Sequence, residues 1–149
     1  MTADIDTMLP KASDLRKKIA LAEAAKASEA MRRHSQEEIE KKALLEHLLK
    51  PSGVSDEEAI RRASVIIERA VSNGVNEVQV IRFPNTLCSD HGRAINQQEP
   101  GWEQTLTGLP REMYELWARQ FRPRGYKLRV QIIDFPNGMP GDVAMTLAW

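Results

Sequence analysis

The sequence predicts an α+β fold: a two-layer sandwich in which a small three-stranded mixed sheet carries two helices on one face, preceded by a long N-terminal helical arm. Composition changes at residues 50–53, because all but one of the lysines precede Pro51 and most of the prolines follow Lys50. Apolar residues then recur with a helical period in residues 55–74. They alternate with other residues in two later segments, which is the period of a strand.

The arm comprises residues 1–50, which are rich in Ala, Lys and Glu. We expect it to be helical from Ser13, a suitable N-cap, to Leu49, because Pro51 lacks an N–H and restricts the residue before it. Its apolar stripe is too interrupted for a coiled-coil seam. Ser35 and Glu38, which follow His34, have the spacing of a capping box, a pattern found at the start of a helix. The sequence therefore leaves open whether the arm is one helix or two. We expect a solvated arm whose leucine-rich end packs on the domain or on a second copy.

The compact domain, residues 51–149, opens with the clearest helical signal of the chain. Ser55 and Glu58 have the spacing of a capping box, and Asn73-Gly74 supplies a residue for the left-handed conformation that ends a helix. We expect this helix to bury one clear face. Its apolar positions are Ala59, Ile60, Ala63, Ile66, Ile67, Ala70 and Val71.

A strand, a long loop and a second helix follow. Val78–Phe83 is rich in β-branched and aromatic residues and predicts the strand, whereas residues 84–109 have few periodic apolar positions. Pro110 suits the first turn of a helix, which must end before Pro123. Trp117 lies on the apolar stripe of this helix, so we expect it in the core.

Two further strands are predicted at Tyr126–Phe135 and Val143–Trp149. In the earlier strand Lys127, Arg129 and Gln131 share the face opposite the apolar residues. In the later strand Trp149 falls on the inward face. The last two strands are expected to form an antiparallel hairpin, and the long crossover allows a parallel connection between the first two, hence a mixed sheet.

Polar residues concentrate in the long loop, at Asn85, Cys88, Asp90, His91 and Arg93. Cys88 with His91 is a possible nucleophile and base, although no third member is evident. Cys88, Asp90 and His91 include metal-ligand types, but a closed site needs four ligands. We favour a structural interpretation, in which the thiol packs as an apolar group, Asp90 caps a turn and Arg93 pairs with a carboxylate. Binding of a small ligand or peptide through His91 and Arg93 stays open.

A basic stretch surrounds the end of the second helix and the start of the second strand. Its members are Arg119, Arg122, Arg124, Lys127 and Arg129. Such a stretch can hold a phosphate or nucleic acid, but the whole chain has 21 basic and 21 acidic residues, whereas a nucleic-acid module usually has an excess of basic ones. We favour a solvated face with ion pairs over nucleic-acid binding.

Composition also predicts where the protein works. The first residues, Met1–Asp6, are acidic and precede no apolar run, unlike a secretory signal. No stretch approaches the roughly 20 apolar residues that span a bilayer. A single cysteine, Cys88, excludes an internal disulfide. We therefore expect a cytoplasmic protein without membrane association.

No complete set of catalytic residues is evident, and we expect neither a cofactor nor a bound metal. The leading prediction is a non-enzymatic interaction or regulatory protein that self-associates as a homodimer or larger homo-oligomer, or binds a protein partner. Residues 1–50 or an open sheet edge would form the interface. The alternatives are a small-ligand-binding domain or enzyme with its site on Asn85–Arg93, and nucleic-acid binding through Arg119–Arg129.

Overall fold

The structure is a computed structural model that describes residues 5–149. The chain divides into two compact units, Met1–Ala43 and Leu44–Trp149. Helix α1 comprises Ile5–Met8, and helix α2 runs without a break from Ala12–Leu49, so the one-helix alternative is the one observed. The end of α2 belongs to the second unit.

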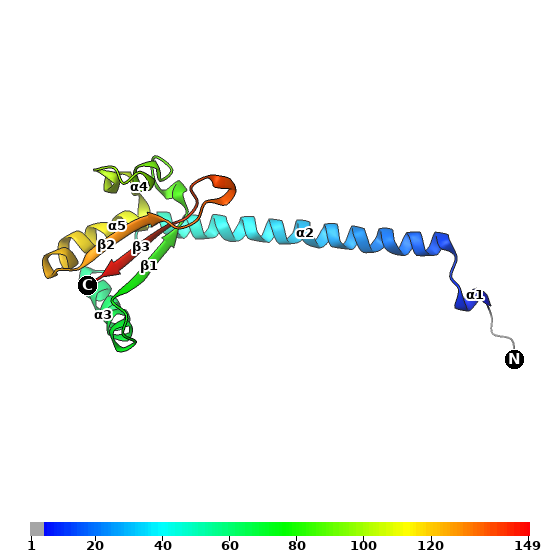
Figure 1. Cartoon of the computed structure of the whole chain (residues 1–149), viewed down its shortest axis with the longest axis horizontal. Helices are drawn as coiled ribbons and strands as arrows, with labels where there is room; N and C mark the ends of the chain where they lie inside the picture. The colour runs from blue at the N-terminus through cyan, green and yellow to red at the C-terminus, as the bar shows by residue number, and fades with distance from the viewer. Residues whose placement is uncertain (1–4) are drawn as a thin grey trace. The chain divides into compact units, whose positions relative to one another are not determined.

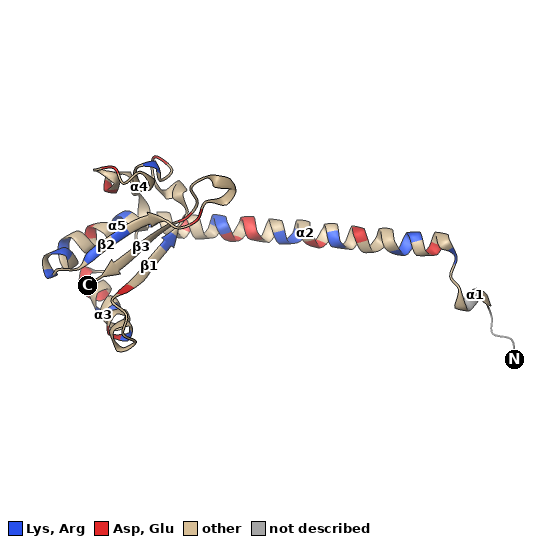
Figure 2. Cartoon of the chain, viewed as in Figure 1, with Lys and Arg blue, Asp and Glu red and all other residues tan. Residues whose placement is uncertain are grey.

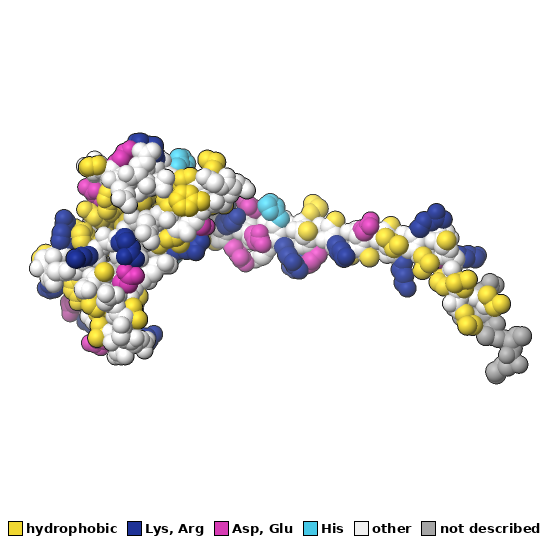
Figure 3. All heavy atoms as spheres, in the orientation of Figure 1, with side chains coloured by type: hydrophobic (Ala, Val, Ile, Leu, Met, Phe, Trp, Pro, Cys, Tyr) yellow, Lys and Arg dark blue, Asp and Glu magenta, His cyan; other side chains and the backbone are white. Residues whose placement is uncertain are grey.

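Within the first unit, α2 has no apolar side. Leu15, Ile19, Leu21 and Met31 are all exposed. Basic and acidic residues alternate along the helix (Figure 2), and apolar side chains are scattered between the charged ones (Figure 3). Within a single chain these side chains are therefore exposed, as expected for a solvated arm.

Helix α3 spans Asp56–Ser72 and confirms the first predicted helix of the domain. The Oγ of Ser55 accepts a hydrogen bond from the Glu58 N–H at 3.2 Å, as the capping sequence predicts. At the other end the Asn73 N–H donates to the Ala70 carbonyl at 3.1 Å, and Gly74 follows with φ 73°. The local sequence is sufficient to define both ends of this helix.

The sheet contains β1 (Glu77–Phe83), β2 (Lys127–Ile132) and β3 (Val143–Ala148) in the order β1-β3-β2 (Figure 1). Both neighbouring pairs are antiparallel, so the predicted β2–β3 hairpin is confirmed and the predicted mixed sheet is wrong. The strand β3 lies between β1 and β2, which therefore run in the same direction without pairing. A period of two identifies a strand but does not identify its neighbours, which is why the strand order was missed.

The inner face of the sheet consists of three apolar rows that cross all three strands. The rows are Val78–Leu147–Leu128, Ile81–Met145–Val130 and Phe83–Val143–Ile132. A bulge between Gln79 and Ile81 brings one extra residue into β1. Lys127, Arg129 and Gln131 lie on the opposite face, as predicted.

Trp149 lies outside the core, contrary to the prediction. The strand β3 ends at Ala148, and the Trp149 side chain beyond it remains 37% exposed. The second strand is also shorter than predicted, because pairing with β3 ends at the pair Ile132–Val143. Residues 133–135 instead enter the connection to β3, where the Ile133 N–H still donates to the Asp142 carbonyl at 2.9 Å.

Helix α5 (Gly108–Leu116) continues into a π-helical turn, Trp117–Phe121, which confirms the predicted helix ahead of Pro123. Pro110 is the third residue of this helix and lies in its first turn, as predicted. Gly108 has φ 59°, and a Cβ there would collide with the carbonyl oxygen of Leu48. This close approach allows the end of α2 to pack against the start of α5, so the predicted packing of the leucine-rich end on the domain is confirmed.

The predicted loop at residues 84–109 contains short helical turns, among them α4 (Arg93–Asn96), rather than being wholly irregular. It contributes Leu87, Ile95 and Leu106 to the core, where all three are buried. They pack with the buried Leu48, Phe83, Cys88, Val143 and Met145. The tightly packed core therefore gathers toward the Phe83–Val143–Ile132 row of the sheet.

Candidate ligand-binding cavity

The polar side chains of the 84–109 segment mainly bind its own backbone and neighbouring loops. Asn85 Nδ2 donates to the Pro140 carbonyl at 2.6 Å, and the two carboxylate oxygens of Asp90 accept from the N–H groups of Gly92 and Ala94. Arg93 pairs with Glu99 at 2.9 Å. These contacts match the structural interpretation of this segment.

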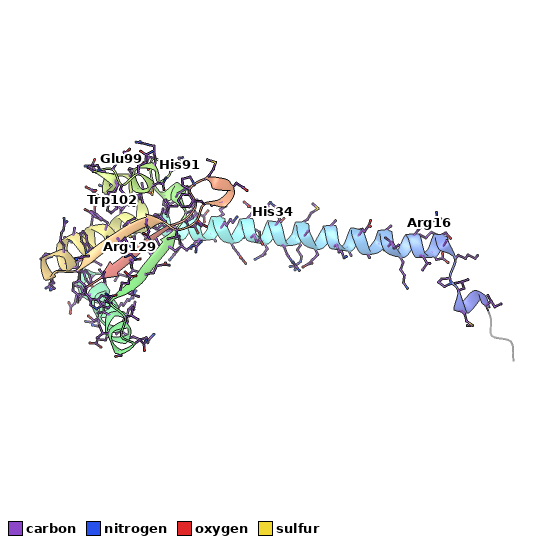
Figure 4. The ribbon with its side chains drawn as sticks, in the orientation of Figure 1. Arg16, His34, His91, Glu99, Trp102 and Arg129 are labelled. Carbon is purple, nitrogen blue, oxygen red and sulfur yellow. The ribbon has the colours of Figure 1, made fainter. Side chains whose placement is uncertain are left out.

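His91 is exposed and lies on the outer part of the same segment as Glu99 (Figure 4). Its backbone has φ 55°, and its N–H donates to the Cys88 carbonyl at 3.0 Å, which closes a tight turn. The Cys88 side chain, by contrast, is buried in the core. The nearness of Cys88 and His91 in sequence therefore reflects a turn of the backbone.

Burial raises the pKa of the Cys88 thiol to about 11, and the nearby Asp90 charge acts in the same direction. The thiolate is the reactive form, so we expect this thiol to be unreactive at neutral pH. In the folded protein at pH 8, dithionitrobenzoate should modify Cys88 at least about a hundredfold more slowly than in the guanidinium-unfolded chain. Similar rates in the two states would contradict the buried position.

The same shift has a consequence for stability. The folded state holds the Cys88 proton more tightly than the unfolded chain does. The protonated thiol therefore makes its full contribution to the free energy of unfolding at pH values below the pKa of this thiol in the unfolded chain. That contribution is lost as the pH rises toward about 11.

The members of the basic stretch are distributed over different surfaces. Arg119 binds Asp56, Arg129 binds Glu77 at 2.9 Å, and the Arg122 guanidinium lies 4.8 Å from the centre of the Trp117 ring. Arg124 donates to a carbonyl of the preceding turn, and Lys127 is exposed on β2. Most of these cations already have partners within the chain, which is the solvated, ion-paired arrangement that the sequence favours.

A cavity of about 550 Å³ lies between α3, α5 and the inner face of the sheet. Its floor includes the row Val78–Leu147–Leu128, and Met145 borders it. The predicted arrangement of two helices over one sheet face is therefore observed, but the space between them is not filled by side chains. The tight core occupies the opposite end of the same face.

Helix α3 borders this cavity with the face that the sequence predicts to be buried. None of its residues is buried, and Ile66 is 45% exposed. The helix lies beside the edge strand β1 (Figure 1). Ala59 and Ala63 line the cavity on the α3 side, and their short side chains leave the space open. The predicted buried face of α3 is thus only half-buried.

The other apolar walls come from α5 and the turn that follows it. Leu109, Met113, Leu116, Trp117 and Phe121 line them. The Trp117 Nε1–H donates to the Tyr126 carbonyl at 3.2 Å, which fixes the orientation of the indole at the cavity wall. The sequence identified Trp117 as a core residue, and it lines a cavity of the core instead.

Polar residues also line the cavity, and two carboxylates among them accept hydrogen bonds from other residues of the chain. Asp56 accepts hydrogen bonds from Arg119 Nη2 at 2.9 Å and from Gln120 Nε2 at 3.1 Å. The Arg119 guanidinium lowers the pKa of the Asp56 carboxyl, so this pairing is complete above the usual pKa of an aspartate and is lost in acid. Glu112 accepts from the N–H of Ser52 at 3.1 Å and from its hydroxyl. These contacts tie the start of α3 to α5.

Sequence reasoning singled out Arg119 but missed the role of Asp56, Glu112 and the cavity itself. One signal was present: the stripe of α3 combines bulky residues with Ala59 and Ala63, which are too small to fill the space over a sheet. Within residues 5–149, no group of three His, Cys, Asp or Glu side chains is arranged to hold a metal ion. Nor is any described helix both long and apolar enough to cross a membrane.

Comparisons with protein-family models, curated proteins and solved structures found no match to this chain.

Proposed function

We propose that the compact unit, Leu44–Trp149, binds a small apolar molecule in the cavity between α3, α5 and the sheet. One observation carries the proposal: a strongly amphipathic helix, α3, has no buried residue while its apolar face borders an apolar space of about 550 Å³. Small-molecule sites typically have volumes of about 300–1,000 Å³ and mostly apolar linings with a few polar groups. The cavity has both properties.

Filling the cavity is energetically favourable for both partners. Ile66, Ile67 and Trp117 line it, and covering their exposed area with apolar groups contributes roughly 25 cal/mol per Å². A bound molecule would therefore complete a layer of the core that the chain leaves unfinished. The polar rim would position one end of the molecule, since a few polar groups set orientation in such sites.

Access to the cavity requires little rearrangement. Gly53, just ahead of α3, has φ 68°, and a side chain at its Cβ would meet no neighbour within 4 Å. Gly74 beyond the other end of the helix has the same two properties. Residues at the ends of elements commonly absorb hinge motion. Release of the Asp56–Arg119 and Ser52–Glu112 contacts would let α3 move away from α5.

The test uses bromodecanol, whose bromine quenches an indole on contact. We expect saturable quenching of the tryptophan fluorescence, because Trp117 lines the cavity. Trp117→Phe should remove most of this quenching. The matched variant Trp149→Phe, which changes an exposed indole at the end of the chain, should retain it. No saturable quenching, or quenching that persists in Trp117→Phe, would contradict the proposal.

Self-association through residues 1–50 or a sheet edge stays a prediction of the sequence. The prediction that the protein is not an enzyme has the same standing. Binding in the cavity is compatible with both. Sedimentation of the full chain at micromolar concentrations would check the association.

A further inference from the structure

We infer that the molecule bound in the cavity is an amphiphile with an acidic head group, such as a medium-chain carboxylate, whose chain fills the cavity and whose head lies at the rim beside Lys50 and Arg62. This inference rests on the proposed function and specifies its ligand class. It follows from the charges that line the cavity and from the partners that those charges already have.

Three permanent cations line the cavity, Lys50, Arg62 and Arg119, against two carboxylates, Asp56 and Glu112. Only one of the two carboxylates is paired with one of the three cations. Asp56 is occupied by Arg119, and Glu112 accepts both hydrogen bonds from Ser52. Neither carboxylate is paired with the two remaining cations.

Lys50 forms no ion pair with any residue in the described range 5–149. It follows the last residue of α2 and is exposed at the cavity, where His47 is also a lining residue. Arg62 pairs with Glu58 at 3.2 Å, and Arg61 pairs with both Glu57 and Glu58. Lys50 is therefore the lining lysine or arginine without an ion-pair partner among the described residues, and it lies next to an apolar interior.

An unpaired cation beside an apolar cavity, here Lys50, discriminates between ligands by the charge of their head group. An anionic head is attracted, a neutral head gains nothing from the charge, and a cationic head is repelled. The carboxylates of Asp56 and Glu112 already accept hydrogen bonds that connect α3 and the residues before it to α5 and the turn after it. A cationic head group could pair with either carboxylate only by replacing those hydrogen bonds. The expected order of affinity is carboxylate, alcohol, then quaternary ammonium.

The experiment compares decanoate, decanol and decyltrimethylammonium, which share one chain and differ in the head. Each would compete with bromodecanol on the full-length protein, with loss of tryptophan quenching as the signal. Decanoate should bind about tenfold more tightly than decanol at low salt, and added salt should reduce this preference. The double variant Lys50→Gln with Arg62→Gln should lower decanoate affinity by about tenfold and leave decanol affinity unchanged.

Lys42→Gln is the matched control, because Lys42 is an exposed lysine of α2 that does not line the cavity. It should alter neither affinity. Equal binding of decanoate and decanol, or tighter binding of the ammonium compound, would overturn the acidic head group while leaving cavity binding intact. Failure of all three to displace bromodecanol would overturn this inference and the proposed function together.

Discussion

The substitution Ala63→Phe is expected to abolish measurable binding of bromodecanol and to raise the melting temperature of the compact unit. Ala63 lines the cavity from α3, so a phenyl ring at this position would occupy the space that the ligand needs. The same ring would cover apolar walls that are now exposed. A net gain of about 1 kcal/mol, after the lower helix propensity of Phe, corresponds to roughly 4–8 °C in a domain of this size.

Ser64→Phe is the matched control for this change. Ser64 is the next residue of α3 and is exposed, and its hydroxyl donates to the Ile60 carbonyl at 2.9 Å. A phenyl ring there should leave ligand binding unchanged and should not raise the melting temperature. Titration calorimetry with decanoate and a thermal melt followed by tryptophan fluorescence would measure both effects. Retained binding in Ala63→Phe would place the ligand elsewhere.

The largest expected loss of stability follows from Phe83→Ala. Phe83 is 1% exposed and packs in the core with Leu87 and Val143. Removing a buried phenyl ring leaves a void and usually costs about 3–5 kcal/mol. A loss of this size is a large fraction of the 5–15 kcal/mol that stabilises a typical domain. Urea unfolding followed by tryptophan fluorescence should show the midpoint falling steeply.

Phe135→Ala provides the comparison, since Phe135 is 52% exposed in the connection between β2 and β3. It should change the free energy of unfolding by no more than about 0.5 kcal/mol. Fluorescence is the appropriate signal because all three tryptophans lie in the compact unit, whereas circular dichroism also reports the helix of the first unit. Equal losses in the two variants would contradict the described core.

Local patterns were sufficient to predict most of the regular elements. The cap at Ser55, the stripe that follows it and Asn73-Gly74 define α3 closely. Alternation predicted β2 and β3, and the short connection between them predicted their hairpin. These features depend on neighbouring residues, so a single sequence contains the information.

Strand order is a property of the whole fold and was not predicted. One feature of the sequence is consistent with the central position of β3. On the sheet face opposite the core, this strand carries the small residues Ala144 and Thr146. Both are buried, although they face away from the core. Longer side chains of the edge strands, such as Arg82 and Arg129, flank them in the sheet. Small outward residues between longer neighbours are a feature of this middle strand.

The cavity was not predicted, since its volume depends on the distance between α3 and the sheet, which the small side chains of Ala59 and Ala63 do not determine by themselves. The sequence correctly identified Ile66, Ile67 and Trp117 as members of an apolar face. It could not reveal that the 84–109 segment and the end of α2 would fill one end of the sheet and leave the other open. The polar residues of that segment have side-chain types that occur in functional sites, but most of their hydrogen bonds and ion pairs are made within the segment and to the loop before β3.

The placement of β3 has a consequence for how the protein folds during synthesis. The middle strand of the sheet is the last to leave the ribosome, and Glu77 at the start of β1 finds its partner only when Ala148 has emerged. Until then neither β1 nor β2 has a neighbour, and both expose unpaired backbone groups of the kind that promote aggregation. The sheet must therefore assemble late, after all three of its strands have been synthesised.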